Sequence, residues 1–198
     1  MATRLFLAST SPYRAAQLAR LGLPFTVEAP GIEEQAIEGE APRNQALRLA
    51  HAKARAVSAR HPEAWVLGSD QVAVCAGRVH GKPRDAARCR TQLRASSGQA
   101  VDFHTAAVLL RGRPQALCEH IDDTIVRFRA LADDEIARYV ESDRPFDCAG
   151  GFRSEGLGAS LFQSVETRDP TALIGLPLFW VAAALQSAGF EPLSPAHS

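Results

Sequence analysis

The stretch Leu5–Arg14, with the sequence LFLASTSPYR, predicts a strand that runs directly into a helix. Ser11 is a good N-cap residue, and Pro12 suits the first helical position because its missing donor would be unpaired there anyway. The free N–H groups and the positive dipole end of such a helix attract anions, and Arg14 adds a fixed positive charge. The stretch therefore has two interpretations, an anion site or an ordinary capped helix, between which the rest of the chain decides.

Strands and helices alternate along most of the chain. We expect strands over residues 4–8, 25–29, 65–75, 101–110 and 119–129, and helices over 12–21, 42–60, 84–95, from 133 onward, and over 177–188. This alternation favours an α/β fold with a central mixed, twisted sheet flanked by helices. The hairpin over 101–129 requires at least one antiparallel pair. The 198 residues suit a single domain, 1–198, with a frayed tail over about 190–198.

Composition excludes several classes of protein. Lys plus Arg is 22 and Asp plus Glu is 22, so no overall charge favours a nucleic acid polymer or an anionic membrane as a partner. The N-terminus lacks a secretory pattern, and the longest nearly apolar run, 173–185, is too short to span a membrane. The four cysteines are scattered without CxxC or zinc-type spacing, so we expect reduced thiols and a cytoplasmic location.

Two charged side chains interrupt apolar segments. Lys53 lies four residues after Leu49 and four before Val57, on the apolar stripe of the helix over 42–60. Its ammonium group either reaches out to water or points into a cleft to meet phosphate. Asp70 follows the apolar start of the strand over 65–75 and is interpreted as the end of a buried strand, either a turn residue or an acid placed at the edge of a sheet.

Three loop segments carry further candidates. Lys82 lies on the tight turn Gly81-Lys82-Pro83, which lacks the flanking pattern of a P-loop. Glu33 and Glu34 are either solvated surface or, beside Asp70 and a polyphosphate, ligands for a hard cation such as Mg²⁺. The glycines around Glu155 indicate either a close backbone approach or an ordinary flexible loop.

Taken together and in this order, these segments resemble the Maf family of nucleoside triphosphate pyrophosphatases. The resemblance extends from Leu5 to Leu185 and depends on the whole set being in register: Ser9, Ser11 and Arg14 in an SxSxxR turn, Glu33-Glu34, Lys53, Ser69-Asp70-Gln71, Gly81-Lys82-Pro83, Ala149-Gly150-Gly151 and Gly175-Leu176-Pro177. It implies a fold like that of Maf proteins and inosine triphosphatases, with a cleft between two lobes. It also implies hydrolysis between the α- and β-phosphates of a nucleotide.

The resemblance also implies roles for individual residues. The triphosphate is expected to bind Ser9, Ser11, Arg14, Lys53 and Lys82, whose charges offset the charge that develops during phosphoryl chemistry. Asp70 is expected to be the general base for the attacking water. Glu34, together with Asp70, is expected to hold a divalent cation, Mg²⁺ or Mn²⁺. Whether Asp70 acts as base, metal ligand or both stays open.

Three positions make the chain similar to the branch of the family that acts on 7-methyl-GTP, in the clearance of modified nucleotides. Tyr13, Gln71 and Glu155 stand where the branch acting on dTTP and UTP usually has arginine, threonine and glutamine. N7-methylation makes guanine cationic, so the ring of Tyr13 gains cation–π as well as stacking energy. The Glu155 carboxylate is suited to accept from the guanine N1–H and N2 amino donors. Ala106 departs from the common family pattern, in which glycine is frequent, and we expect only a local packing effect.

Two alternative functions are retained. The substrate is either 7-methyl-GTP or another triphosphate such as dTTP, UTP or an oxidised nucleotide. In a different class, the protein is a regulator of cell division that binds a nucleotide without hydrolysis, although a sensor has no need for a base beside phosphate ligands. The resemblance further implies a homodimer, and the apolar pair Phe179-Trp180 suits either an interface or core packing.

Overall fold

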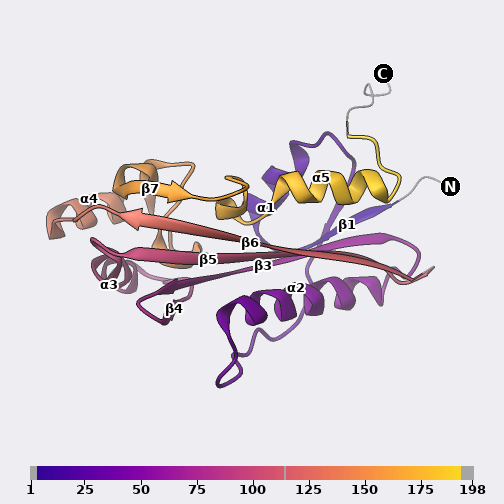
Figure 1. Ribbon diagram of the computed structural model, residues 1–198, viewed down its shortest axis with the longest axis horizontal. Coiled ribbons are helices and arrows are strands. Elements are labelled where there is room, and N and C mark those ends of the chain that lie inside the picture. Colours follow the sequence, from indigo (N-terminus) through magenta and orange to yellow (C-terminus); the bar gives the residue numbers. More distant parts are fainter. Residues whose placement is uncertain (1–3, 114, 193–198) are drawn as a thin grey trace.

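The computed structural model describes residues 4–113 and 115–192, so the predicted frayed tail lies mostly outside the described residues. Its centre is a mixed sheet with the strand order β2-β1-β3-β5-β6-β7, to which β4 is added beside β3 (Figure 1). The strands are β1 (Leu5–Ala8), β2 (Thr26–Glu28), β3 (Trp65–Cys75), β4 (Arg78–His80), β5 (Ala100–Arg111), β6 (Ala116–Phe128) and β7 (Phe162–Glu166). The mixed α/β architecture predicted from the sequence is confirmed.

The helices lie close to their predicted positions. They are α1 (Pro12–Ala19), α2 (Pro42–Ser58), α3 (Ala86–Ser96), α4 (Asp133–Asp143) and α5 (Leu178–Ser187), with short 3₁₀ turns η1 (Ala149–Gly151), η2 (Leu157–Leu161) and η3 (Ala172–Ile174). No helix in the described part of the chain is long and apolar enough to cross a membrane. The four cysteines are free, as predicted, with Cys75 and Cys89 buried and the other two partly buried.

Alternation along β1 explains how the sheet acquires two covered faces. Leu5 and Leu7 join a core with α1 and α5, whereas Phe6 and Ala8 join a second core with α2. All four residues of β1 are buried, as expected of a parallel strand covered on both sides. Figure 1 shows α2 on one face and α5 with α1 on the other. A third core, around the Phe128 and Phe152 rings, packs beneath α3 and α4 at the other end of the sheet.

Strand β3 runs through the middle of the sheet. The edge of β3 that lies opposite β5 is paired at its two ends but not in between. Strand β1 pairs in parallel with Trp65–Gly68, and β4 pairs antiparallel with Ala73–Cys75. Among the described strands, none pairs with residues 69–72 on that edge, while β5 pairs with β3 over its whole length. The sheet therefore opens at this point into the cleft between two lobes that the sequence predicted.

The apolar pair near the C-terminus is divided between two environments. Trp180 stacks on His120, with ring centroids 5.6 Å apart, whereas Phe179 is 64 % exposed. Core packing therefore accounts for Trp180 but not for Phe179. The homodimer stays a prediction.

Candidate active site

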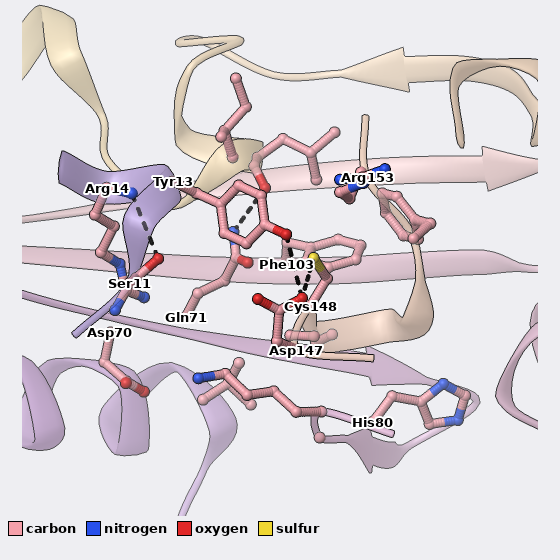
Figure 2. Close-up of a pocket in the computed structure, with 18 of the residues that line it drawn as sticks. Ser11, Tyr13, Arg14, Asp70, Gln71, His80, Phe103, Asp147, Cys148 and Arg153 are labelled. Atoms are coloured by element: carbon pink, nitrogen blue, oxygen red, sulfur yellow. Dashed lines mark hydrogen bonds between the residues drawn. The ribbon is translucent and has the colours of Figure 1, made fainter. Parts of the chain in front are cut away.

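A cavity of about 290 Å³ occupies the cleft at the uncovered edge of β3 (Figure 2). All the predicted site residues except Ser9 line it: Ser11, Tyr13, Arg14, Glu34, Lys53, Asp70, Gln71, Lys82 and Glu155. Ser9 is buried behind the turn, where its Oγ accepts a hydrogen bond from the Ser11 amide at 3.1 Å. The structure therefore gives Ser9 a supporting contact within the turn.

The turn into α1 has the geometry predicted for it. Ser11 is extended, and its Oγ accepts from the Arg14 amide at 3.4 Å, with Pro12 at the start of the helix. The Arg14 Nε donates to the carbonyl of Gly175 at 3.0 Å, and the Ser69 hydroxyl donates to the same carbonyl at 2.9 Å. Gly175 has φ +135°, and a Cβ there would lie 3.2 Å from Arg14 Nε, so a glycine is needed at this contact.

Lys53 joins two carboxylates at the floor of the cavity. Its Nζ lies 2.5 Å from Asp70 Oδ1 and 2.7 Å from Glu34 Oε1. Both Lys53 and Asp70 are buried, at 5 % and 7 % exposure. Of the two interpretations of Lys53, the structure supports the one that points its ammonium into a cleft.

Asp70 lies in the interior of β3 and not at a strand end, which corrects the interpretation drawn from its sequence. The strand continues because β5 pairs with it beyond this point, with Asp70 opposite Ala106. Its carboxylate lines the cavity, which opens along the side of the strand where β1 stops opposite Gly68, rather than at the strand's end. Burial raises the pKa of Asp70, against the opposing effects of Lys53 and Arg14.

Glu34 has the opposite electrostatic behaviour. Burial disfavours its ionised form, but the Lys53 ammonium, helped by Lys82 and Arg14, outweighs this effect and lowers the pKa of Glu34. The two carboxylates therefore differ in proton affinity although they share one ammonium. Glu34 favours its ionised form, and Asp70 is the one whose proton affinity is raised.

Positive charge exceeds negative charge at this end of the cavity. Partial desolvation of its ammonium, together with the nearby charge of Arg14, lowers the pKa of Lys82. The lining includes the cations Arg14, Lys53, Lys82 and Arg84, against the carboxylates of Glu34 and Asp70. Several cations converging on one concave surface suit a polyanion such as a polyphosphate.

The donor set fits a divalent cation that is shared with a phosphorylated ligand. In residues 4–113 and 115–192 there is no group of three or more His, Cys, Asp or Glu side chains arranged to hold a metal. Mg²⁺ is commonly bound by one or two carboxylates and completes its shell with phosphate oxygens and water. Glu34 and Asp70, both in contact with one ammonium, supply that number of carboxylates.

The other end of the cavity is aromatic and carries two further carboxylates. The Tyr13 hydroxyl donates to Asp147 Oδ1 at 3.2 Å, and Phe103 and Phe152 form part of the same lining. Burial, with contributions from Cys148 and Asp147, raises the pKa of Tyr13 to about 12. Glu155 lies beside them and accepts from the Ser154 hydroxyl at 3.2 Å.

Gln71 reaches the cavity but uses most of its amide for structure. Its Nε2 donates to Thr105 Oγ1 at 2.9 Å and to the carbonyls of Ala172 and Leu173 at 3.0 and 3.1 Å. These bonds hold η3 against the sheet. Only the amide oxygen is left to meet a ligand.

The loop that carries Glu155 is anchored to α4. The Arg153 amide donates to the Tyr139 hydroxyl at 3.0 Å, which in turn donates to Asp143 Oδ2 at 2.8 Å. The Arg153 guanidinium forms an ion pair with the same Asp143. A Cβ at Gly156 would lie 3.1 Å from Asp143 Oδ1, so the glycine segment reflects close packing against the protein and not an ordinary flexible loop.

Sequence analysis gave no role to several residues that line the cavity, among them His80, Arg84, Asp147, Cys148 and Arg153. The only indication for the last three was their position beside the glycine segment. His80 belongs to β4, a strand too short for its pattern to be recognised.

An α/β sheet whose edge opens into a cleft with a cation-rich end and an aromatic end is an arrangement typical of nucleotide-binding proteins. The chain matches the family described as Maf-like protein over residues 4–188, and it belongs to this family. The family predicted from the sequence is thus confirmed.

The similarity to known relatives covers nearly the whole chain. It is 50 % identical over 188 residues to the 7-methyl-GTP pyrophosphatase of Xanthomonas axonopodis pv. citri, covering 95 % of this chain and 98 % of the relative. It is 47 % identical to the protein of the same name from Aromatoleum aromaticum, covering 94 % and 96 %. The solved Staphylococcus aureus Ham1 protein shares the fold, with a TM-score of 0.53 at 11 % identity, covering 94 % of this chain and 100 % of that one.

Proposed function

We propose that this protein hydrolyses 7-methyl-GTP to 7-methyl-GMP and pyrophosphate. The observation that carries the proposal is a single cavity that joins a buried acid–ammonium pair, Asp70 and Lys53, to an aromatic end with Tyr13 and Glu155. Relatives about 50 % identical over nearly their full length bear the name of this activity. The four free cysteines suit a reducing compartment, so we also propose a cytoplasmic location.

In the proposed reaction, Asp70 accepts the proton of the attacking water. The water oxygen forms a bond to the α-phosphorus. The bond from that phosphorus to the oxygen bridging the α- and β-phosphates breaks, and pyrophosphate leaves with the electron pair. The raised pKa of Asp70 makes its carboxylate a better proton acceptor than an ordinary aspartate. Arg14, Lys53 and Lys82 stabilise the charge that develops on the phosphate oxygens.

A divalent cation, Mg²⁺ or Mn²⁺, completes the proposal. Glu34 and Asp70 would hold it together with phosphate oxygens, and when bound it neutralises phosphate charge and fixes the phosphates in place. Lys53 keeps both carboxylates directed at the same point, at 2.7 and 2.5 Å. The residues of the chain therefore position the phosphates, and Asp70 removes the proton.

At the aromatic end, the base would stack on Tyr13. The positive charge of a 7-methylated guanine strengthens this contact through cation–π attraction. The Glu155 carboxylate lines the cavity on a loop fixed to α4 through Arg153, and it would accept from the base N1–H and N2 amino donors. A pyrimidine does not offer the same pair of donors.

Pyrophosphate release by the purified protein tests the proposal. With Mg²⁺ or Mn²⁺ present, we expect kcat/KM to be highest for 7-methyl-GTP in a comparison with GTP, UTP and dTTP. Tyr13→Arg and Glu155→Gln should both reduce that preference. A preference for UTP or dTTP would overturn the choice of substrate, and no release from any triphosphate would favour a nucleotide-binding regulator.

The role of Asp70 is tested by Asp70→Asn. We expect it to abolish turnover while its circular dichroism spectrum stays that of the parent protein. Asp122→Asn is a matched control, because Asp122 is also a buried aspartate on the sheet but lies outside the cavity lining. Substantial residual activity in Asp70→Asn would exclude Asp70 as the base.

A further inference from the structure

Asp147 makes the contact that closes the aromatic end of the cavity. It lies between α4 and η1, while Tyr13, the donor to its Oδ1 at 3.2 Å, lies on α1. Figure 2 shows the Tyr13 hydroxyl directed at Asp147, with Cys148 beside it. The Cys148 thiol also donates to Asp147 Oδ1, at 3.6 Å. One carboxylate oxygen thus holds the far end of the Tyr13 ring from across the cleft.

The same carboxylate contributes to a separation of charge along the cavity. Arg153 lines this end as well, and its ion pair with Asp143 compensates its charge. Asp147 and Glu155 therefore leave the aromatic end negative, whereas the end around Arg14 and Lys53 is positive. A ligand with an anionic polyphosphate and a cationic base matches both ends, and a nucleotide with a neutral base matches only one.

The hydrogen bond also affects the ring itself. A phenol that donates to a carboxylate gains electron density, and the negative face of the ring is the part that attracts a cation. A cationic base stacked on Tyr13 would also lie close to the Asp147 charge. Both effects act on a cationic base and are weaker for a neutral one of similar shape.

We propose that Asp147 is a specificity residue: its carboxylate holds Tyr13 in place and supplies the negative charge that favours a cationic, N7-alkylated purine over the neutral purine. This inference rests on the proposed function, because it concerns the base of the same nucleotide. It assigns to Asp147 two separable contributions, an acceptor for the Tyr13 hydroxyl and a charge for the base.

Two substitutions separate these contributions. Asp147→Asn removes the charge but keeps an oxygen that accepts from Tyr13, whereas Asp147→Ala removes both. Binding of 7-methyl-GMP and GMP is measured by calorimetry below neutral pH, where the methylated base keeps its N1 proton and its positive charge. Asp102→Asn is the matched control, since Asp102 is an exposed aspartate outside the cavity lining.

We expect Asp147→Asn to weaken 7-methyl-GMP binding by about fivefold and GMP binding by less than about twofold, the scale of a partly exposed charge pair. High salt should shrink this difference, because it screens the charge. Asp147→Ala should weaken the binding of both ligands. In the Asp147→Ala background, Tyr13→Phe should cause no further loss of GMP binding. The Asp102→Asn control should bind both ligands like the parent protein.

Equal losses for the two ligands in Asp147→Asn, or no loss for either, would overturn the proposal. It would also fail if the parent protein bound 7-methyl-GMP no more tightly than GMP. The proposed function fails by a different measurement, namely the absence of pyrophosphate release from 7-methyl-GTP. Calorimetry with the two monophosphates decides on Asp147 in that case as well, since it requires no turnover.

Discussion

At the scale of single residues, the cleft is organised around a buried cation that the surrounding chain holds in place. Ala50 and Ala54 lie one helical turn apart on α2 and are buried against the sheet. Lys53, on the same side of the helix, therefore points at the edge of β3. The sequence predicted the face of the helix on which Lys53 lies, since helical periodicity is local. It did not predict that Glu34 meets Lys53, because the loop carrying Glu34 has no periodic pattern.

Lys53→Met should make stability strongly dependent on pH. The Lys53 ammonium lowers the pKa of Glu34, so its stabilising effect is present above the ordinary glutamate value of 4.5 and is lost as pH falls. Removing one partner of a buried pair costs about 3 kcal/mol. We therefore expect urea denaturation to show a loss of about this size at neutral pH and a much smaller loss at acid pH, once the pH has fallen below the lowered pKa of Glu34.

Arg48→Met is the matched control for this prediction, because Arg48 lies on the same helix as Lys53 and pairs with Glu40 nearer the surface. We expect it to destabilise the protein less, with a weaker dependence on pH. Equal losses for Lys53→Met at neutral and acid pH would contradict the electrostatic explanation. Turnover by Lys53→Met should fall by about 100-fold, since it loses a phosphate-binding charge.

Both tyrosines of the chain should resist ionisation in the folded protein. Burial raises the pKa of Tyr13 to about 12 and that of Tyr139 further still. Unfolded protein in urea should titrate near the ordinary value of 10.0. Because the folded state keeps protons that the unfolded state loses, the free energy of unfolding should fall as pH rises from about 10 towards 12. Tyrosinate absorbance measured in Tyr139→Phe isolates Tyr13, and native ionisation near pH 10 would contradict the raised pKa of Tyr13.

At the scale of elements, Gly68 sets how closely α2 approaches the sheet. The parallel pairing of β1 with β3 ends at this residue, opposite Ala8. A Cβ on Gly68 would overlap the carbonyl of Ala50 and come within 2.8 Å of the Ala54 amide. Both contacts are backbone atoms of α2, so they cannot move unless the helix moves. The position of Lys53 therefore depends on a glycine two residues before the acid with which it pairs.

Gly68→Ala should displace α2 and impair both stability and activity. Overpacking of this kind costs about 1–3 kcal/mol, and turnover should fall because Lys53 moves away from Asp70. Gly81→Ala is the stability control, because nothing lies within 4 Å of a Cβ at that position. Urea denaturation and pyrophosphate release measure the two effects. Unchanged stability in Gly68→Ala would show that α2 is not held at this contact.

The sequence predicted the elements better than their junctions. Periodicity and capping gave the five helices and the long strands, because these patterns are local. The sequence analysis missed β4 because Arg78–His80 is too short to show alternation. It placed Asp70 at a strand end because a sequence does not reveal where a neighbouring strand stops. Asp147 was missed since its partner, Tyr13, is 134 residues away and no local pattern connects them.

At the scale of the whole molecule, the cavity lies between two halves that share β3, β5 and β6. The cation-rich end, the proposed phosphate end, draws on α1, α2 and the loop after β4, and the aromatic end draws on η1 and the loop that follows it. In Figure 1 these groups of elements lie along the length of the same long strands. The Tyr13–Asp147 bond already spans the cleft, and a bound nucleotide would add a second connection between the two ends of the cavity. The two parts of the nucleotide should therefore stabilise the protein more when they are joined than when they are separate.

Ligand-induced stabilisation of Asp70→Asn, which should bind without turnover, measures this effect. With Mg²⁺ present, 7-methyl-GTP at 100 times its Kd should stabilise by about 2.7 kcal/mol and raise Tm by roughly 5–10 °C. Pyrophosphate tests the phosphate end alone and 7-methylguanosine the aromatic end alone. At equal concentrations, the intact nucleotide should exceed the two fragments added together, because linkage raises their effective concentration. If the fragment mixture raised Tm as much as the nucleotide does, the two ends would be independent sites and not one cleft that binds a single nucleotide.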